Sequence, residues 1–505
     1  MKFNYFNKAK NVVTNYEGAK AYSLSPEMEL YSAVVTSGLN DVTYEKDSDR
    51  LKRIQQLIQK CNPEFIAKLA VYVRNEMYMR SVPMVLTVEL AKISSGNNLV
   101  STMMQKVIQR ADEITELLAY YQMANKRTDT KKLNRLSKQI QKGLAESFNR
   151  FDEYQFAKYN RQGEVKLRDA LFLVHPKAKD EAQQLVFNKI AANTLSVPYT
   201  WETQLSEVGQ RAFKNQAEKQ QAFKEIWEAL IDSNRLGYMA MLRNLRNIIE
   251  AGVSFAHMEK VCNYLSNANA VANSKQLPFR FLSAYREIKE LKSRYTTMVL
   301  DALEDAVMYS SENIKGFDAR TSVVIACDVS GSMQQPVSKN SKVLLYDIGL
   351  MLGMLMQSRC KNVISGMFGD RWKVINMSKR NVLANVQEFY RREGEVGYAT
   401  NGYLVIEDLI KRNEIVDKVM LFTDVQMWNS NNTTHSFENS WNRYKAMAPN
   451  AKLYLFDLAG YGQVPLDIKQ NDVYLIAGWS DKVFDVLHAL EDKTSALQYI
   501  NRIVL

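Results

Sequence analysis

The chain has 505 residues, 46% of them hydrophobic, which is enough for two or more domains with sizeable cores and excludes a disordered chain. Its four cysteines are scattered, with no C-x-x-C pair, so neither a disulfide framework nor a zinc site is expected and a reducing compartment fits. No apolar run approaches the roughly 20 residues of a membrane helix, and the first residues lack a secretory signal, so we expect a cytoplasmic protein without a membrane partner.

Positive charge is concentrated in the first three-fifths of the chain. The formal net charge is +11, with +13 on residues 1–300 and −2 on residues 301–505. A basic excess confined to one part indicates a polyanionic partner for that part. Solubility alone is the alternative explanation of so modest an excess.

From about residue 25 to 310 the sequence shows the hydrophobic pattern of successive amphipathic helices. Apolar residues recur at helical spacing, and the breaks are short and contain Pro or polar clusters. Paired helices with no strand signal predict an α-solenoid, here HEAT-like, although no fixed repeat period is found. The expected helices cover 47–60, 64–78, 83–93, 98–109, 111–124, 131–148, 179–192, 217–231 and 238–250.

Two basic stretches lie in this helical part. The first places its cations four, three and four residues apart, so that they share one helix face. Such a stripe can follow a phosphate backbone, but taken alone it is better explained as a solvated face. The second stretch mixes cations with an aromatic residue and a lone histidine. The candidates are Lys131, Arg135, Lys138 and Lys142 in the first stretch, and Lys158, Arg161, Lys166, Arg168, His175 and Lys177 in the second.

From about residue 320 short apolar strands alternate with helices, which predicts a doubly wound parallel sheet of the Rossmann-like α/β class. The expected strands cover 322–327, 362–368, 418–423, 451–457 and 472–477. The expected helices cover 341–358, 381–392, 402–412, 436–447 and 481–490.

Oxygen-bearing side chains follow the strands of this second part. Asp328, Ser330 and Ser332 come directly after one apolar strand, and Asp424 follows another. Thr400 lies between them in a Gly-flanked loop. Because the carboxyl ends of parallel strands share one edge of a sheet, these side chains can meet there. An all-oxygen set suits a hard cation such as Mg²⁺. Taken alone, the first three residues are better explained as a turn followed by a helix cap, and it is Thr400 and Asp424 that favour a metal site.

The five residues together resemble the metal-ion-dependent adhesion site (MIDAS) of von Willebrand factor A (vWA) domains. The resemblance implies a divalent metal ion, most often Mg²⁺. It implies that Asp328, Ser330 and Ser332 form the core of the site. In that family Thr400 would coordinate directly and Asp424 through water, and the remaining coordination position is left for an acidic group of a partner.

The helical part resembles the TROVE module, the helical-repeat ring of the Ro autoantigen ribonucleoproteins. The similarity lies in short sequence motifs spread along the chain. In that family such a ring is followed by a C-terminal vWA domain, which is the order found here. It implies a TROVE-like ring over residues 1–315 and a vWA-like domain over residues 316–505. The motifs are Tyr72, Arg74, Arg80 and Pro83, the run 152–155, the stretch around Lys158 and His175, the run 242–245, and the run 278–280.

This resemblance implies RNA binding by a monomer. Ro proteins hold small structured Y RNAs on the outer ring surface and admit single-stranded 3′ ends of misfolded RNAs through the ring hole. They take part in RNA quality control and can tether RNA to an exoribonuclease. Lys158 and His175 match two positions that contact Y RNA, and the remaining cations of the second stretch are candidates by proximity. For Arg243, within the run 242–245, a structural role is equally expected.

We expect no catalysis. The sequence has no nucleophile elbow, no P-loop and no H-E-x-x-H motif, and its four histidines form no acid–base or metal-binding pattern. A two-metal nuclease would need more carboxylates than this cluster offers. The alternative function is a metal-dependent protein–protein adaptor, in which the vWA-like domain captures an acidic residue of a partner.

Overall fold

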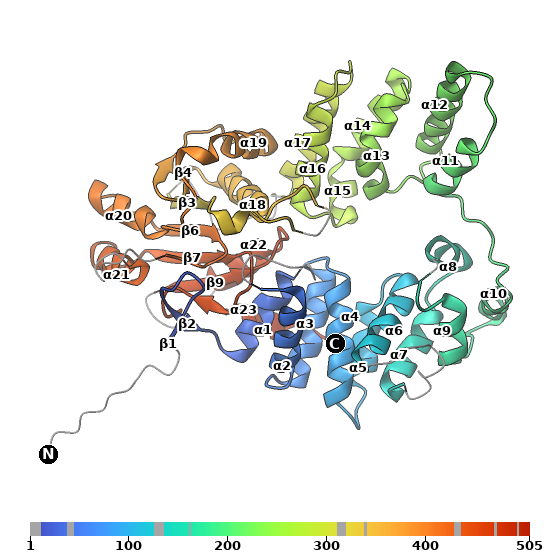
Figure 1. Ribbon diagram of the computed structural model, residues 1–505, viewed down its shortest axis with the longest axis horizontal. Helices are drawn as coiled ribbons and strands as arrows, with labels where there is room; N and C mark the ends of the chain where they lie inside the picture. Colours follow the sequence, from blue (N-terminus) through green and yellow to red (C-terminus); the bar gives the residue numbers. More distant parts are fainter. Residues whose placement is uncertain are drawn as a thin grey trace. The chain divides into compact units, whose positions relative to one another are not determined.

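The computed structural model describes residues 12–37, 45–125, 136–160, 163–310, 320–337, 341–428, 436–468, 472–491 and 494–505. The chain forms two compact units (Figure 1). The α/β unit contains Met1–Lys60, Leu277–Ser283 and Val307–Tyr499, and the helical unit contains Cys61–Gln276, Ala284–Ala306 and Ile500–Leu505. These units differ from the predicted division at residue 315, because the N-terminal segment groups with the α/β unit.

A six-stranded sheet with the order β5-β4-β3-β6-β7-β9 forms the centre of the α/β unit. All neighbouring strands are parallel except β5, which runs antiparallel to β4 at one edge. The predicted strands and the α/β class are confirmed, whereas the short edge strand β5 has no counterpart among the predictions. The strands are β3 (Ser322–Asp328), β4 (Asn362–Phe368), β5 (Trp372–Val374), β6 (Lys418–Thr423), β7 (Lys452–Asp457) and β9 (Val473–Ala477).

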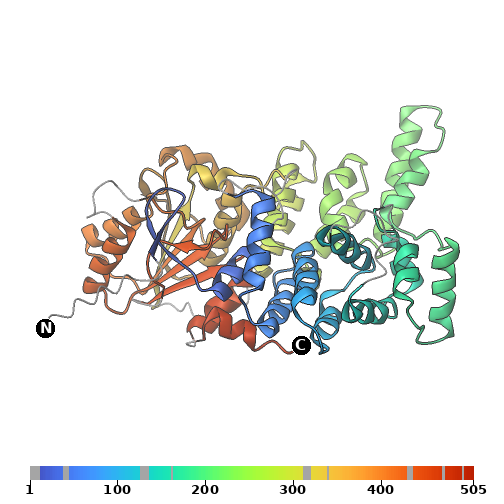
Figure 2. The ribbon, with the colours of Figure 1, turned by 60° about the horizontal axis from the view of Figure 1, so that its bottom comes forward.

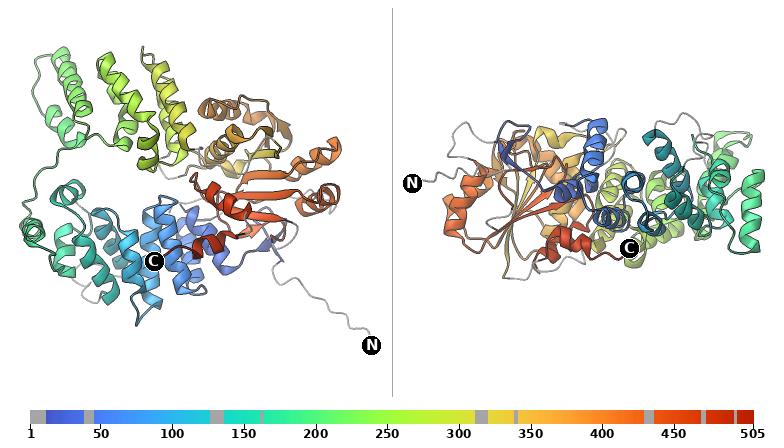
Figure 3. Two further views of the ribbon diagram at one scale, coloured as in Figure 1. Left: turned by 180° about the vertical axis from the view of Figure 1, so that it is seen from behind. Right: turned by 90° about the horizontal axis from the view of Figure 1, so that it is seen from below.

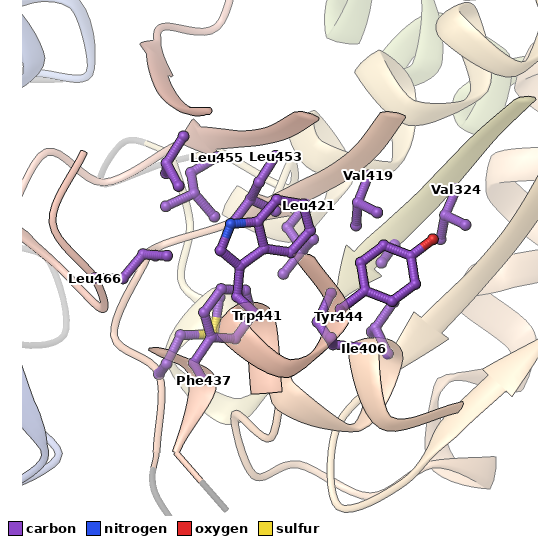
Figure 4. Packing of buried hydrophobic residues seen from close by; sticks show 14 of the residues in the cluster. Val324, Ile406, Val419, Leu421, Phe437, Trp441, Tyr444, Leu453, Leu455 and Leu466 are labelled. Atoms are coloured by element: carbon purple, nitrogen blue, oxygen red, sulfur yellow. The ribbon is translucent and has the colours of Figure 1, made fainter. Parts of the chain in front are cut away.

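Helices cover both faces of this sheet, as the doubly wound prediction requires. On one face Trp441 and Tyr444 pack into a buried cluster with Val419 and Leu421 of β6 (Figure 4). On the other face a Cβ atom on Gly353 would lie 2.8 Å from the sulfur of Cys327, so glycine is needed for the close approach of its helix to β3. The helices are α18 (Leu345–Arg359), α19 (Val382–Arg392), α20 (Tyr403–Arg412), α21 (Phe437–Met447), α22 (Val483–Glu491) and α23 (Ala496–Asn501).

The N-terminal segment adds a small antiparallel sheet and two helices to the same unit. Strands β1 (Val12–Thr14) and β2 (Lys20–Ser23) form a hairpin, and β2 also pairs with β8 (Gln463–Val464). In Figure 2 this hairpin, in dark blue, lies over the strands of the unit. Helices α1 (Pro26–Val35) and α2 (Asp47–Ile58) follow.

Buried polar contacts explain why this segment belongs to the α/β unit. Tyr31 Oη donates a hydrogen bond to the carbonyl oxygen of Ala477, at the end of β9, at 3.0 Å. The Ser32 hydroxyl donates to the carboxylate of Asp457. Arg50 is 2% exposed and donates to the carbonyl oxygen of Ala459 at 2.6 Å. These groups would lose their partners if the segment packed elsewhere, which is costly for buried polar atoms.

The helical unit consists of consecutive helices that pack mainly against near neighbours in the sequence, such as α3 with α4 and α5 with α7. Figure 3 shows the blue to green helices of this unit side by side. The predicted helices are confirmed to within a few residues where the structure describes them. The helices of this unit are α3 (Pro63–Asn75), α4 (Ser81–Ile93), α5 (Leu99–Val107), α6 (Asp112–Ala124), α7 (Lys138–Phe148), α8 (Glu153–Tyr159), α9 (Leu167–Val174), α10 (Glu181–Ala192), α11 (Trp201–Gly209), α12 (Gln216–Asp232), α13 (Tyr238–Glu250), α14 (Phe255–Leu265) and α15 (Ala268–Ser274), together with parts of α16 (Pro278–Lys289) and α17 (Thr296–Ser310).

A buried carboxylate ties three of these helices together. Glu113, fully buried in α6, accepts hydrogen bonds from Arg74 Nη2 at 2.7 Å and Arg80 Nε at 3.3 Å. Its second oxygen accepts from the backbone N–H groups of Gln109 and Arg110. The ends of α3, α4 and α5 therefore converge on one charge, which gives Arg74 and Arg80 a structural role.

No helix within the described residues is long and apolar enough to cross a membrane.

Candidate functional sites

The first candidate site lies where β3 ends, and its central group is a buried carboxylate. Asp328 is 1% exposed. Its Oδ1 atom accepts a hydrogen bond from the backbone N–H of Ser330 at 2.9 Å, and its Oδ2 atom accepts one from Thr423 Oγ1 at 2.5 Å. The hydroxyl oxygens of Ser330 and Ser332 lie 3.3 Å apart. The loop after β3 thus turns back on itself and brings three oxygen-bearing side chains together.

The neighbouring strand β6 contributes a second buried carboxylate. Asp424 is fully buried, and its Oδ1 atom accepts a hydrogen bond from the backbone N–H of Gln426 at 3.0 Å. Its Oδ2 atom has no hydrogen bond of good geometry within the described part of the chain, although the Ser332 hydroxyl is near enough to lower the pKa of this carboxyl. A buried carboxylate oxygen without a donor is costly unless a cation or another donor satisfies it.

The two carboxylates destabilise each other's charged forms. Burial, and then the negative charge of Asp328, raises the pKa of Asp424 above its ordinary value. Burial also raises the pKa of Asp328, although the hydrogen bonds from Thr423 and Ser330 oppose this effect. A divalent cation bound by these oxygens would reverse this penalty, because it neutralises both carboxylates.

Thr400 completes the set predicted from the sequence. It is 4% exposed, and its carbonyl oxygen accepts a hydrogen bond from the backbone N–H of Trp428 at 3.0 Å. Thr400 and Ser332 line the same hollow of about 420 Å³. The structure therefore gathers Asp328, Ser330, Ser332, Thr400 and Asp424 at the carboxyl edge of the sheet, as expected from the parallel strand order.

These oxygens are the right donors for a hard cation, since two carboxylates and three hydroxyls match the ligand preference of Mg²⁺. Among the described residues, no group of three or more His, Cys, Asp or Glu side chains could hold a metal ion, so any site here depends on the hydroxyls. Sequence reasoning missed Thr423, the donor to Asp328, and Glu17, which lines the hollow. Thr423 directly precedes Asp424 in the sequence, whereas Glu17 lies far away and gives no local signal.

The second candidate site is a cationic and aromatic hollow in the helical unit, which we call the helical-unit hollow. Lys158, the predicted RNA contact, is exposed at the end of α8, and its Nζ atom lies 5.7 Å and 5.6 Å from the ring centroids of Tyr154 and Tyr159. The guanidinium of Arg110 lies 4.2 Å from the Tyr159 ring. Cations and rings therefore alternate on this surface.

The hollow has a volume of about 340 Å³ and extends from α8 to α13. The guanidinium of Arg235 lies 5.7 Å from the Tyr199 ring, and Tyr154 Oη donates a hydrogen bond to the carbonyl oxygen of Tyr199 at 3.3 Å. One carboxylate, Glu202, also lines it. The other charged and aromatic lining residues are Arg110, Lys158, Arg243, Tyr159, Trp201 and Tyr238.

Among the predicted RNA-contact residues that the structure describes, Lys158 alone lines this hollow. His175 ends α9 in a left-handed conformation with φ 52° and is exposed. Arg168 lies 5.6 Å from the half-exposed ring of Phe172. Lys166, Lys177, Lys138 and Lys142 are exposed, the last two one helical turn apart on α7. Lys131, Arg135 and Arg161 lie outside the described residues.

The sequence did not single out Arg110, Arg235 or Tyr199. They come from separate elements, and each alone looks like an ordinary surface residue. For Arg243 the sequence predicts a structural role as readily as a functional one, and the structure places it exposed on the rim of the hollow. A signal was present in the run 152–159, where two tyrosines flank Lys158.

Comparison with known proteins agrees with this architecture. The TROVE domain family matches residues 30–224 and 193–327. Telomerase protein component 1 of Mus musculus is 24% identical over 323 residues, covering 49% of this chain and 12% of that protein. The Rattus norvegicus protein of the same name is 23% identical over 350 residues, covering 53% of this chain and 13% of that protein. The chain thus spans about an eighth of the length of these relatives.

A solved structure shares the fold over nearly the whole chain. The crystal structure of the Deinococcus radiodurans RO (RSR) protein superposes with a TM-score of 0.58, at 18% identity, over 92% of this chain and 100% of that chain. This likeness confirms the predicted fold, helical repeats followed by an α/β domain.

Proposed function

Because the chain belongs to the TROVE-domain family, we propose that it is a Ro-like RNA-binding protein that carries no catalytic activity of its own. The family match spans residues 30–327 in two overlapping parts, which include most of the helical unit. The observation that carries the proposal is the helical-unit hollow, where four cations alternate with tyrosine and tryptophan rings.

This combination suits RNA because it offers both kinds of contact that RNA needs. Arginine and lysine neutralise phosphates, and the planar guanidinium also stacks and forms bidentate hydrogen bonds. Unpaired bases stack on exposed aromatic rings. Tyr154 is 43% exposed, so its ring is available to a ligand. An acidic protein partner would form ion pairs with the cations but would make no contact that needs the aromatic rings.

The finer role follows the family pattern. The preferred ligand is a small structured, Y-like noncoding RNA held on the outer ring surface, with single-stranded 3′ ends of misfolded RNA entering through the ring hole. The exposed cations Lys138, Lys142, Lys166, Arg168 and Lys177, together with His175, would extend the phosphate-binding surface beyond the hollow. In this role the protein serves RNA quality control or brings RNA to an exoribonuclease.

The α/β unit adds a divalent metal site, with Mg²⁺ as the preferred ion. The two buried, mutually repelling carboxylates fit a cation held by Asp328, Ser330, Ser332, Thr400 and Asp424. When bound, the ion would supply a positive charge able to hold an acidic group. Thr423 orients Asp328 for this purpose through its 2.5 Å hydrogen bond.

The second candidate function is a metal-dependent adaptor. The observation that favours it is the hollow beside the five oxygen-bearing residues, which is open enough to receive a side chain of another protein. The two functions are compatible, since one uses the helical unit and the other the α/β unit.

Salt and charge reversal test the RNA proposal. Binding of a structured RNA, followed by fluorescence anisotropy, should weaken steeply with salt because each neutralised phosphate releases counterions. Lys158→Glu should weaken it further and reduce the salt slope, whereas Lys214→Glu, an exposed lysine outside the hollow, should have little effect. EDTA should leave binding intact. Equal affinity for Lys158→Glu and the unchanged protein would refute the role of the hollow, and loss of all binding in EDTA would favour the adaptor.

A further inference from the structure

The β1–β2 hairpin ends in a tight turn next to the candidate metal site. The backbone N–H of Asn15 donates to the carbonyl oxygen of Ala19 at 2.9 Å, and the N–H of Gly18 donates to the carbonyl oxygen of Asn15 at 3.0 Å. Gly18 has φ +77°, a left-handed conformation that glycine adopts without strain. The Asn15 side chain accepts a further hydrogen bond from the N–H of Ala19 at 2.8 Å. The turn is therefore well defined.

The turn is fixed to the loop that carries Asp424. Asn15 is 6% exposed and donates from Nδ2 to the carbonyl oxygen of Met427 at 2.7 Å. The backbone N–H of Tyr16 donates to Gln426 Oε1 at 3.0 Å, and Gln426 in turn donates its own N–H to Asp424 Oδ1. The hairpin turn and the metal-site loop thus form one hydrogen-bonded assembly.

This anchoring places an acidic side chain at the mouth of the site. Glu17 stands between the anchored Tyr16 and Gly18 and lines the same hollow as Ser332 and Thr400. A third carboxylate beside a buried, like-charged pair is unfavourable by itself, and a shared cation would remove the conflict.

We propose that Glu17 is an internal ligand of the metal site: when an ion is bound, its side chain turns inward and its carboxylate takes the coordination position that faces the hollow. The inference rests on the proposed metal site. In adhesion sites of this kind that position is left for an acidic group of a partner. Here the chain's own N-terminal hairpin fills it, so an acidic partner must first displace Glu17. The adaptor function would then be held closed until the Glu17 side chain is displaced.

The buried pair of carboxylates, Asp328 and Asp424, supports a cation at this place independently of Glu17. The half-buried position of Glu17 allows both states, because the side chain can swing toward solvent without breaking the Asn15 and Tyr16 anchors. Displacement would leave the hydrogen bonds of Asn15 and Tyr16, and with them the fold of the unit, intact.

Mn²⁺ serves as the probe, because its bound waters are counted by proton relaxation. The full-length protein is compared with Glu17→Ala, with Glu17→Gln as a second, less disruptive variant, and with Glu27→Ala of α1 as a matched loss of charge outside the hollow. Glu17→Ala should weaken Mn²⁺ binding by roughly tenfold, as expected for removal of a group that supports a metal site. It should add about one inner-sphere water. It should also let free acetate bind the metal-loaded protein, which the unchanged protein should resist.

The outcomes separate this inference from the metal site itself. Asp328→Ala should abolish Mn²⁺ binding. If it does, and Glu17→Ala and Glu17→Gln keep the affinity, water count and acetate response of the unchanged protein, Glu17 is not a ligand although the metal site stands. If the unchanged protein binds no Mn²⁺, the metal site and this inference both fail. Equal melting temperatures in EDTA for the Glu17 variants and the unchanged protein would show that any loss of Mn²⁺ binding is not due to unfolding.

Discussion

The guanidinium of Arg110 stacks over the ring of Tyr159 at 4.2 Å from its centroid and is held in that plane by Asp112. Two hydrogen bonds, from Arg110 Nε at 3.1 Å and Nη2 at 2.9 Å, reach the two carboxylate oxygens of Asp112. A bidentate contact of this kind fixes the orientation of the guanidinium group. The ammonium group of a lysine could not form it. The rim of the helical-unit hollow is thus organised before any ligand arrives.

We therefore predict that Arg110→Lys weakens RNA binding although it conserves the charge. The variant keeps one positive group for phosphates but loses the stacked plane and the bidentate contact. Stacked cations of this kind contribute about 0.5–2 kcal/mol, so the dissociation constant should rise by a few-fold up to about thirtyfold at constant salt. Fluorescence anisotropy with a structured RNA measures this. An unchanged affinity would show that the Arg110–Tyr159 stack is not part of the interface.

The buried charge cluster around Glu113 gives a stability prediction. Glu113→Ala would leave Arg74, which is 8% exposed, without its carboxylate partner. Removing one member of a buried ion pair costs about 3–5 kcal/mol, so the urea midpoint of the helical unit should fall strongly. Glu116→Ala is the matched control, because Glu116 binds Arg80 from a 42% exposed position. Its loss should cost less than about 1 kcal/mol. Equal effects of the two variants would contradict the structural role of Glu113.

The sequence predicted elements whose signal is local and failed where partners come from distant segments. Strands β3 and β6 are predictable because each is a short run of buried, mainly apolar residues. The three-residue strand β5 was missed because its exposure pattern differs little from that of a loop. Strands β1 and β2 lie in a polar N-terminal segment, and pairing with β8, more than 400 residues later, stabilises them.

The candidate sites follow the same rule. Asp328 and Asp424 end neighbouring parallel strands, so the order of the elements alone brought them together. Glu17 reaches the same hollow only through contacts of Asn15 and Tyr16 with residues 426 and 427. Such a contact cannot be predicted from the periodicity of the sequence. The grouping of Arg110 with Arg235 around one hollow cannot be predicted from it either.

For the metal site we predict that Mg²⁺ raises the melting temperature of the unchanged protein and leaves that of Asp328→Ala unaltered. An ion stabilises a protein only through a site that the folded state offers, and Asp328 is the carboxylate on which the hydrogen bonds of Ser330 and Thr423 converge. Thermal melts with and without Mg²⁺ decide this, with EDTA melts as the reference for each variant. A Mg²⁺ effect of the same size in Asp328→Ala would place the ion elsewhere.

An anchoring carboxylate links α8, which carries Lys158, to the segment that carries Tyr199. Glu153 accepts hydrogen bonds from Lys189 Nζ at 2.6 Å, from Ser196 Oγ at 2.9 Å and from the backbone N–H of Ser196 at 3.1 Å. These contacts lower the pKa of the Glu153 carboxyl from its ordinary value of 4.5 to about 2, with the Lys189 hydrogen bond as the largest cause. The folded state therefore favours the ionised form.

We predict a pH-dependent stability that Glu153→Gln removes. Since the pKa of Glu153 is lower in the folded than in the unfolded chain, the interaction stabilises fully above about pH 4.5 and is lost as the pH falls toward 2. At pH 7 the variant should unfold at a lower urea concentration than the unchanged protein, and the difference should shrink steadily between pH 5 and pH 3. Glu207→Gln, which removes an exposed pair with Arg211, should show almost no difference at any pH. A Glu153→Gln difference that stays constant down to pH 3 would mean that the carboxylate charge does not anchor this segment.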